Sequence, residues 1–288
     1  MQESSLEHIP RVADDGVLLR PLLSLAEYDE AVALQDEIWG AGFTDRVPAS
    51  ILRVAQKVGG VSAAAFDERG RMLGFVFGLT GVRDGQLVHW SDMLAVREEA
   101  RGKRLGERLK QYQRELVRAL GVETMFWTFD PLVARNAHFN LNRLGATIAE
   151  YVPNFYGSNT GSILHGDLPT DRFVAEWAVA PATGTAAGPQ TDLHVSAIAD
   201  APRTSVAENG HTRVIEPFPD APRVLVPVPP DIESVLASNP DAALAWRLAT
   251  RQAMMHYLAR GYRVDRFRRG TERELPAYEL TRLSSNHA

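Results

Sequence analysis

Hydrophobic and polar positions repeat with two different periods along the first 180 residues of the chain. Short apolar runs bounded by turn residues predict strands, and longer segments with apolar residues three and four positions apart predict helices. The clearest helix has a stripe at Leu105, Leu109, Tyr112, Leu116 and Leu120 and closes at Gly121. The apolar runs predict strands over residues 17–20, 61–66, 72–80, 87–96, 123–129, 146–152 and 173–179.

Three further helical segments lie between these strands. One follows Ser24, a good helix cap, and stops at Gly40, and a second has Pro48 in its first turn and ends before Gly59. The third covers residues 134–144 and ends at Gly145. The resulting order, β-αα-βββ-α-β-α-ββ, predicts an α/β (α+β) fold with a mixed central sheet flanked by helices.

Proline divides the chain, because ten of the 17 prolines lie between residues 181 and 240. Residues 181–190 read PATGTAAGPQ and contain too few bulky groups to become ordered by burial. We therefore predict a first domain over 1–180, a linker or extended covering segment over 181–212 with a short strand at 193–195, and a C-terminal module over 213–288.

The C-terminal module has its own pattern of apolar runs. A strand at 223–228, a helix at 241–260 and strands at 262–268 and 278–283 give the order β-α-β-β, which is also the order of residues 123–179. The helix-end sequences Arg143-Leu144-Gly145 and Ala259-Arg260-Gly261 correspond as well. An internal repeat and the common helix-glycine-strand connection explain this likeness equally well.

Composition excludes several classes of protein. Hydrophobic residues make up 45% and charged residues 23% of the chain, as in globular proteins, and the net charge of −5 gives no reason to expect nucleic acid or a membrane surface as a partner. The first residues have neither the basic start nor the apolar run of a secretory signal, so we expect a cytoplasmic protein. The absence of cysteine excludes disulfides and cysteinyl acyl-enzymes, and the eight scattered histidines predict no metal site.

One segment of this acidic protein is basic. From Arg97 to Arg118 there are eight basic residues against four acidic ones, and the segment joins a strand to the leucine-rich helix. Free backbone N–H groups and the dipole at a helix N-terminus attract anions, and small residues such as Gly102 and Gly106 let a phosphate come close. The segment alone is equally compatible with a solvated first turn of the helix.

The run Leu94-Ala95-Val96-x-x-x-x-Arg101-Gly102-Lys103-Arg104-Leu105-Gly106 resembles the pyrophosphate-binding motif of the GNAT (Gcn5-related N-acetyltransferase) superfamily. The motif reads Arg/Gln-x-x-Gly/Ala-x-Gly/Ala after a strand that ends in Val. Arg101 and Gly106 match it, whereas Arg104 stands where the first small residue is expected. The resemblance also covers the element order of residues 17–179, and the C-terminal module resembles half a GNAT domain.

The resemblance implies an N-acyltransferase that moves an acetyl group from acetyl-CoA to an amine of a small molecule or peptide. In this family the loop amides hold the pyrophosphate and the strand edge pairs with the pantetheine arm. Asn136 would lie near that arm, although a cap for its helix is an equally good role. The implied cofactor-binding residues are Leu94, Ala95, Val96, Arg101, Gly102, Lys103, Arg104, Leu105, Gly106 and Asn136.

Direct attack by an amine needs a base for the ammonium proton and an acid for the leaving thiolate. Asp92 stands where many family members carry a carboxylate base, with a structural or water-relay role as the alternative. Leu141 occupies the place of the family's acidic tyrosine, so Tyr151 and Tyr156 are the candidate acids, with cleft-wall positions as the alternative. On a regular strand, His89, Ser91 and Met93 would share the face opposite Asp92.

Arg104 and Leu141 also motivate an alternative, in which the chain binds CoA for regulation or assembly without catalysis. A third hypothesis gives the C-terminal module a ligand of its own, but that module has no Arg-x-x-Gly-x-Gly loop. The acceptor's identity and the oligomeric state, a homodimer included, stay open.

Overall fold

The computed structural model describes residues 11–12, 15–157, 161–162, 168–179, 201–208 and 211–283. Contacts between residues divide the chain into two compact units that follow packing rather than chain order. The domain limits at 180 and 213 therefore stay a prediction from the sequence. Unit 1 holds Met1–Trp127, Thr160–Ile163 and Trp177–Ala182, and unit 2 holds Thr128–Asn159, Leu164–Glu176 and Thr183–Ala288.

Unit 1 is built on a mixed sheet. Its first five strands are antiparallel neighbours in chain order, and β6 then pairs with β5 in parallel. These strands are β1 (Arg11–Val12), β2 (Leu18–Pro21), β3 (Val61–Phe66), β4 (Met72–Arg83), β5 (Gln86–Val96) and β6 (Thr124–Phe129). The unit's helices are α1 (Leu25–Trp39), α2 (Ala49–Lys57) and α3 (Leu105–Ala119).

Local sequence explains where these helices begin and end. The Ser24 hydroxyl accepts the Glu27 N–H at the start of α1, and Gly40 closes that helix with a positive φ of 93°. Pro48 precedes the first turn of α2. The predicted stripe on α3 is confirmed, because Leu105, Leu109, Tyr112 and Leu116 are all buried.

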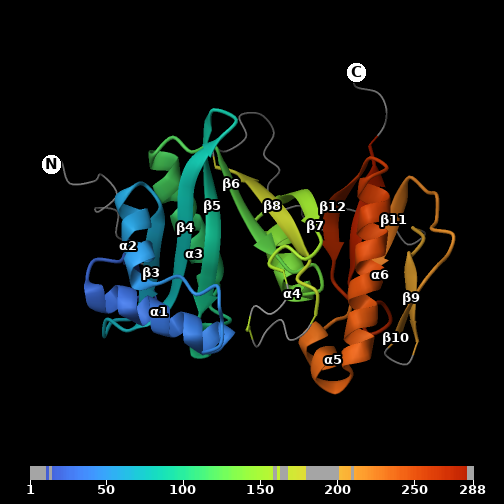
Figure 1. The fold of residues 1–288 in the computed structure, drawn as a ribbon, viewed down its shortest axis with the longest axis horizontal. Coiled ribbons are helices and arrows are strands. Elements are labelled where there is room, and N and C mark those ends of the chain that lie inside the picture. Colours follow the sequence, from blue (N-terminus) through green and yellow to red (C-terminus); the bar gives the residue numbers. More distant parts are fainter. Residues whose placement is uncertain are drawn as a thin grey trace. The chain divides into compact units, whose positions relative to one another are not determined.

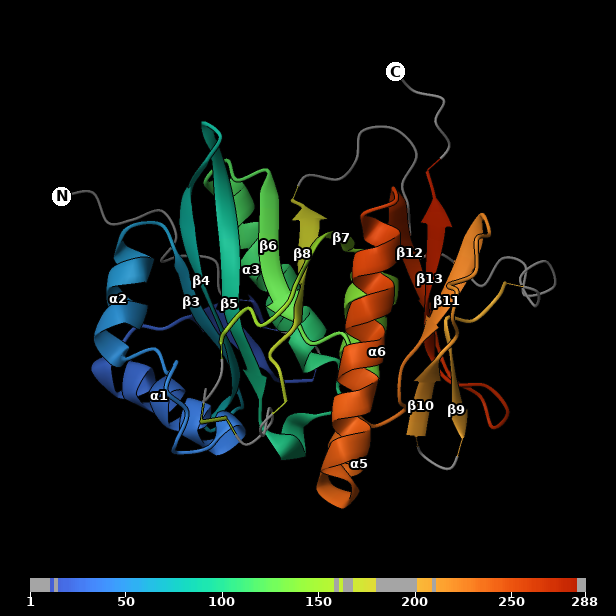
Figure 2. The same ribbon diagram turned by 45° about the vertical axis from the view of Figure 1, so that its right-hand side comes forward.

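The helices cover both faces of the unit 1 sheet (Figures 1 and 2). Buried side chains of α1 and α2 pack on one face against Phe66, Phe75, Phe77, Met93 and Ala95. The opposite face lies under α3, where a Cβ at Gly106 would come within van der Waals range of the Leu94 and Val96 side chains. Strand β5 therefore has one face toward each helical layer.

A β-bulge changes which face each residue of β5 presents. Phe77 of β4 lies opposite Met93, but the next residue, Gly78, lies opposite Ser91, so Asp92 is the extra residue. The prediction for a regular strand is wrong here: His89 and Ser91 bond to α3, whereas Met93 belongs to the α1 and α2 core. The bulge shifts the alternation by one residue.

Unit 2 combines the end of the predicted first domain with the C-terminal module. Strands β7 and β8 are antiparallel, β13 lies between β11 and β12 in a second antiparallel sheet, and β9 and β10 form a hairpin. The strands are β7 (Thr147–Val152), β8 (Arg172–Ala178), β9 (Ser205–Glu208), β10 (His211–Val214), β11 (Arg223–Pro227), β12 (Tyr262–Arg268) and β13 (Ala277–Arg282). The helices are α4 (Ala134–Ala137), the π-helix η2 (His138–Arg143), α5 (Ile232–Ser238) and α6 (Pro240–Leu258).

The predicted α/β fold class and the β-α-β-β order of the C-terminal module are confirmed, with two differences of detail. The helix predicted over 134–144 is a short α-helix that continues as a π-helix. Helix α5 was not expected, although Asp231 caps it by accepting the N–H groups of Glu233 and Ser234. Hairpin β9–β10 lies at the end of the predicted linker, and the strand proposed at 193–195 lies outside the described residues.

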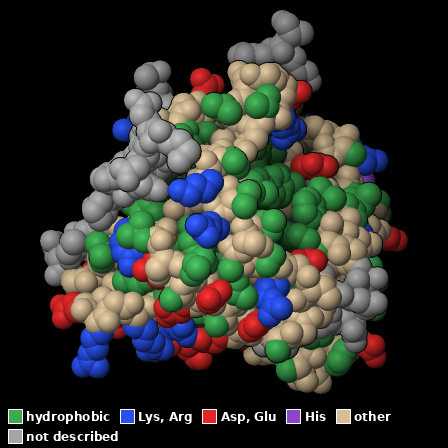
Figure 3. All heavy atoms as spheres, turned by 60° about the vertical axis from the view of Figure 1, so that its left-hand side comes forward, with side chains coloured by type: hydrophobic (Ala, Val, Ile, Leu, Met, Phe, Trp, Pro, Cys, Tyr) green, Lys and Arg blue, Asp and Glu red, His purple; other side chains and the backbone are tan. Residues whose placement is uncertain are grey.

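The surface in Figure 3 mixes hydrophobic, basic and acidic side chains. Exposed hydrophobic residues of unit 1 include Ile51 and Val54 on α2 and Val58 just beyond its end. Among the described residues, no helix is both long and apolar enough to cross a membrane.

Candidate active site

The segment between β5 and α3 presents a row of unused hydrogen-bond donors. A short 3-10 turn, η1 (Glu98–Ala100), follows β5 and uses the N–H groups of Ala100 and Arg101. Within the described part of the chain, the next five backbone N–H groups, those of residues 102–106, have no hydrogen-bond acceptor. They precede or begin a 15-residue helix, so the helix dipole adds a partial positive charge at the same place. We call residues 101–106 the cradle.

Backbone conformation explains the residue types of the cradle. Gly102 has φ of 83°, which favours glycine, and no atom lies within 4 Å of the place a Cβ would take. Arg104 caps α3 in the left-handed conformation, with φ of 56°. Its side chain is 66% exposed and pairs with Glu107 at 2.9 Å, and a guanidinium has no acceptor atom that could occupy the backbone N–H groups. This departure from the family pattern therefore leaves the cradle's N–H groups uncovered.

The basic segment does not form one patch, because acidic partners hold several of its arginines. Arg97 pairs with Glu30 and Glu37, and Arg108 pairs with Asp15. Arg101 and Lys103, by contrast, are exposed and have no ion-pair partner among the described residues. Two cations without an ion-pair partner among the described residues thus lie in the cradle itself.

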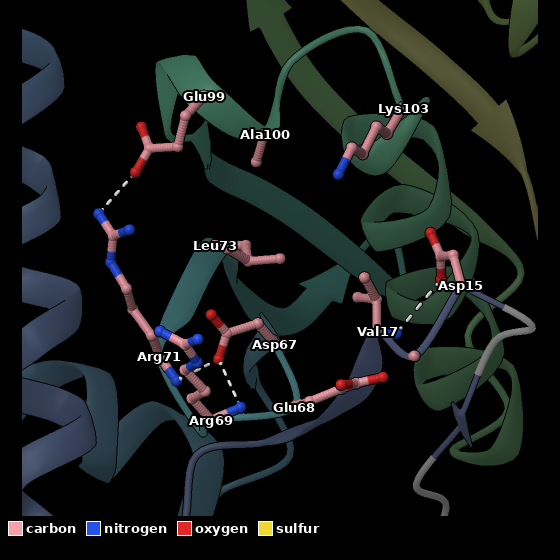
Figure 4. Close-up of a pocket in the computed structure, with 11 residues that line it drawn as sticks. Asp15, Val17, Asp67, Glu68, Arg69, Arg71, Leu73, Glu99, Ala100 and Lys103 are labelled. Atoms are coloured by element: carbon pink, nitrogen blue, oxygen red, sulfur yellow. Dashed lines mark hydrogen bonds and ion pairs between the residues drawn. The ribbon is translucent and has the colours of Figure 1, made fainter.

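A cavity of about 400 Å³ adjoins the cradle. Lys103 points toward it, while Arg71 on the opposite side pairs with Glu99 at 2.5 Å (Figure 4). The apolar part of its lining includes Val17 and Leu73. Four carboxylates and three cationic side chains line the cavity, and one of the three cations is Lys103 of the cradle, so the lining as a whole carries one more negative than positive charge.

Asp92 occupies the bulge of β5 and is exposed to solvent. Neighbouring atoms still remove part of its hydration, and this raises the pKa of the carboxyl group. A hydrogen bond from the Trp90 side chain opposes the rise in pKa, and the negative charge of Asp45 adds to it. A carboxylate with a raised pKa is a stronger base than an ordinary surface aspartate.

Within the described part of the chain, the strand that carries Asp92 also has an edge with no strand partner beyond Trp90. The parallel ladder between β5 and β6 runs from Val88 opposite Thr124 to Trp90 opposite Phe126. Strand β5 continues for six more residues, to Val96, before the cradle begins. The predicted residues Asp92, 94–96 and 101–106 thus follow one another along a single strand end and loop of unit 1.

The other predicted site residues belong to unit 2. Tyr151 is buried and donates its hydroxyl to Asp171 at 2.6 Å, and burial together with that carboxylate raises the pKa of the phenol. Tyr156 is half-buried, with its hydroxyl 2.8 Å from Oγ1 of Thr128. Asn136 lies on α4, and its side-chain amide has no hydrogen-bond partner among the described residues.

Sequence reasoning missed two groups near Asp92. Asp45 acts on it from the loop that follows α1. Lys110 and Gln113 of α3 are buried beneath β5 and bond to Ser91. Their spacing with Val117, three and seven positions along the helix, was a signal for a second buried stripe beside the leucine stripe.

No known family profile matches the sequence, and no curated protein matches it either. Among solved structures, Ard1 from Thermoplasma volcanium is 14% identical, with a TM-score of 0.44 over 57% of this chain and 99% of that one. An aminoglycoside 6'-acetyltransferase type Ii is 18% identical, with a TM-score of 0.45 over 57% and 97% of the two chains. The yncA protein from Salmonella typhimurium, solved with its cofactor acetyl-CoA, is 16% identical, with a TM-score of 0.45 over 61% and 99%.

The fold class of this chain follows from its own elements. The predicted β-αα-βββ-α-β-α-ββ order is present, β5 and β6 are parallel, and the cradle links β5 to α3. These features make the fold GNAT-like, as the sequence motif implied.

Proposed function

We propose that this chain is an N-acyltransferase that moves an acetyl group from acetyl-CoA to the amine of a small molecule or peptide. The observation that carries the proposal is the cradle, with its unused backbone donors and unpaired cations on a GNAT-like fold. A pyrophosphate offers several oxygen acceptors and negative charge, which is the chemistry that such a donor set binds.

Acetyl-CoA supplies the thioester, and the residues of this chain supply binding and proton transfer. The N–H groups of residues 102–106 hold the pyrophosphate, with Arg101 and Lys103 adding charge. The edge of β5 at 94–96 pairs with the pantetheine arm, and a strand N–H near Leu94 donates to the oxygen of the tetrahedral intermediate. The family resemblance assigns the side-chain amide of Asn136, on α4, to the same arm.

Asp92 is the proposed base. Its Oδ atoms accept a proton from the acceptor's ammonium group, and the free amine then attacks the acetyl carbonyl carbon. The thiolate leaves with the electron pair of the broken C–S bond and takes a proton from Tyr156 or from water. The second proton of the acceptor nitrogen, lost as the amide forms, restores that acid. Tyr151 is a weaker candidate acid, because its hydroxyl is already committed to Asp171.

Calorimetric titration with acetyl-CoA, together with a thiol-release assay on a panel of amines, tests the proposal. Binding with release of CoA on at least one amine would support it. Tight binding without release on any amine would favour the non-catalytic CoA-binding alternative. Absence of binding would reject both.

Arg101→Glu tests the cradle directly. We expect the variant to bind acetyl-CoA more weakly by about 1.5 to 3 kcal/mol, the range for losing a charge-assisted contact. Arg118→Glu is the matched control, since it makes the same charge change at the exposed far end of α3 and should leave the affinity close to that of the parent. Equal affinities for all three proteins would show that the cradle does not hold the cofactor.

The pH dependence of the rate tests Asp92. Because the base must be deprotonated and its pKa is raised, kcat/KM should fall as the pH drops toward that pKa and level off above it. Asp92→Asn should abolish this acidic limb and lower kcat. An unchanged profile in the variant would remove Asp92 from the mechanism.

A further inference from the structure

Helix α3 turns two polar side chains toward the sheet. Lys110 is 3% exposed and Gln113 is fully buried, and both lie on the face of the helix that covers β5. The Lys110 Nζ donates to Oγ of Ser91 at 2.7 Å, and the Trp127 ring lies over the amine with its centroid at 3.9 Å. Such polar groups require complete hydrogen bonding when they are buried.

The hydrogen bonds run in one direction through unit 1. After Lys110 donates to Ser91, the Ser91 hydroxyl donates to Oε1 of Gln113 at 2.7 Å. The Gln113 amide is 3.0 Å from Nε2 of His89, whose Nδ1 is 2.9 Å from Oγ1 of Thr80. The Thr80 hydroxyl donates in turn to the Gly59 carbonyl at 2.6 Å. Burial, with the nearby Lys110 amine, lowers the pKa of His89 to about 3, so the ring is neutral and can both accept and donate.

This network joins the two parts of the proposed active site that lie in unit 1. Ser91 is the residue immediately before the bulged Asp92. Lys110 and Gln113 lie on the same helix whose first residues complete the cradle. A rigid helix therefore carries phosphate donors at its start and holds, one to two turns later, the strand residue next to the carboxylate.

Burying a lysine at this position in the fold is energetically unfavourable. Among the described residues no carboxylate lies within ion-pair distance of Lys110, and burial lowers the pKa of its amine well below the usual value. A methionine would fill a similar volume beside Trp127 without that cost. What methionine would lack is the N–H donor to Ser91. Apolar contacts alone allow small shifts between helix and strand, whereas directional hydrogen bonds fix their register.

We propose that Lys110 and Gln113 are positioning residues for acyl transfer, which fix Ser91 and thereby the bulge that presents Asp92 to the cofactor held by the cradle. The inference rests on the proposed function, because it assigns a role in that same reaction. Neither side chain touches the reacting atoms. Their effect is on the geometry of Asp92.

Lys110→Met tests the proposal, with Lys57→Met on the exposed end of α2 as the matched control. We expect Lys110→Met to lower kcat at least tenfold, while the Kd for CoA and the KM for acetyl-CoA stay within twofold of the parent. Ser91→Ala should produce a similar loss, and the double variant should be no worse than the poorer single variant, since both changes break one connection. Lys57→Met should keep full activity.

Three results would overturn the proposal. The first is full activity of Lys110→Met. The second is a loss of CoA affinity in step with kcat, which would indicate general damage to the fold. The third is simple multiplication of the two single losses in the double variant, which would show that Lys110 and Ser91 act independently.

Amide hydrogen exchange separates this inference from the proposed function. If the parent protein transfers no acetyl group to any amine, the proposed function fails, and exchange at residues 91–93 then decides the positioning role. Faster exchange confined to the bulge in Lys110→Met, with the rest of β5 unchanged, would support it. Exchange at the bulge equal to that of the parent would reject it.

Discussion

Lys110 in unit 1 and Arg247 in unit 2 are buried to nearly the same extent, with 3% and 1% of their surface exposed. Arg247 has a counterion, because its Nη2 donates to Asp130 at 2.6 Å. Among the described residues, the amine of Lys110 contacts only the Ser91 hydroxyl and the Trp127 ring. Two buried basic residues of one chain therefore rely on different interactions.

Unit 2 repeats the pairing of opposite charges. Asp171 is fully buried and accepts from Arg251 at 2.5 Å and from the Tyr151 hydroxyl at 2.6 Å. Arg172 also lies 3.5 Å from Asp130. These pairs connect α6 with β8 and with the segment that follows β6, so they fasten the C-terminal module within unit 2.

The difference separates two uses of buried polar groups. Ion pairs in unit 2 compensate charge, and removing one partner leaves the other charge buried and unpaired. The network of unit 1 contains a neutral histidine, and burial also favours the neutral form of Lys110, so it depends on donor direction and close fit. Removing a charge should therefore destabilise unit 2 strongly, and adding atoms to the packed network should destabilise unit 1 strongly.

The largest effect is expected from Asp130→Asn. The variant keeps the side-chain shape but leaves the Arg247 guanidinium, whose Nε and Nη1 have no acceptor among the described residues, without its carboxylate. We expect the free energy of unfolding to fall by about 3 to 5 kcal/mol, as for other broken buried pairs. Denaturant unfolding measures it, and Glu272→Gln, at an exposed residue, should be neutral.

Protonation of Asp130 at low pH should reproduce part of this loss of stability in the parent protein. Burial alone would raise the pKa of Asp130, but the charges of Arg247 and Arg172 outweigh it and lower the pKa. A carboxyl group with a lowered folded-state pKa contributes stability that is present above its unfolded-state pKa, about 4, and is lost as the pH falls through the folded-state value. Stability that is equally acid-sensitive in Asp130→Asn would contradict this assignment.

Gly78→Ala should have the next largest effect on stability, because it causes a steric clash rather than a loss of charge. A Cβ at this position would lie 2.3 Å from Nε2 of His89 and 2.6 Å from the Trp90 carbonyl oxygen, which cannot move away. We expect a loss of about 3 kcal/mol in the free energy of unfolding, at the upper end for an overpacked core. Gly81→Ala in the same strand meets nothing within 4 Å and serves as the control. Equal melting temperatures for the two variants would show that the network tolerates displacement.

The sequence predicted the parts of this comparison that depend on local pattern. The stripe on α3, the turns between strands and the cradle motif all depend on residues close together in the chain. The buried network was not predicted, because Lys110 lies in a segment with seven other basic residues. A run of charged residues on a helix is typical of a solvated face.

Contacts between distant residues were also beyond a single sequence. Asn142 bonds both the N–H and the carbonyl of Phe267, 125 positions away, and Tyr278 donates to the Pro131 carbonyl. The bulge at Asp92 adds one residue to β5, which contains no glycine or proline to mark it. For this reason the alternation on β5 was predicted for a regular strand, and Met93 was assigned to the wrong face.

The smallest expected effect, and the sharpest test of the contrast, is the stability of Lys110→Met as a function of pH. The folded-state pKa of Lys110 lies below its unfolded-state value of 10.5. As the pH falls below about 10.5, Lys110 becomes protonated in the unfolded chain but not in the folded protein. The parent therefore loses stability with falling pH until the folded-state pKa of Lys110 is reached. Methionine removes this penalty, so the variant should be more stable than the parent by about 1 kcal/mol at pH 7, with the gain shrinking toward zero near pH 10.5.

Chemical denaturation of both proteins from about pH 6 to about pH 10.5, the unfolded-state pKa of lysine, measures the difference in their free energies of unfolding. The titrations of all other groups cancel in this difference. A variant that is less stable than the parent at pH 7 would mean that Lys110 keeps its charge and resembles Arg247 after all. A variant that is more stable yet slower in acetyl transfer would show that this lysine contributes to the geometry of the site at a cost in stability. Unit 1 and unit 2 would then differ in what their buried polar groups are for: one places a catalytic carboxylate, and the other fastens a module.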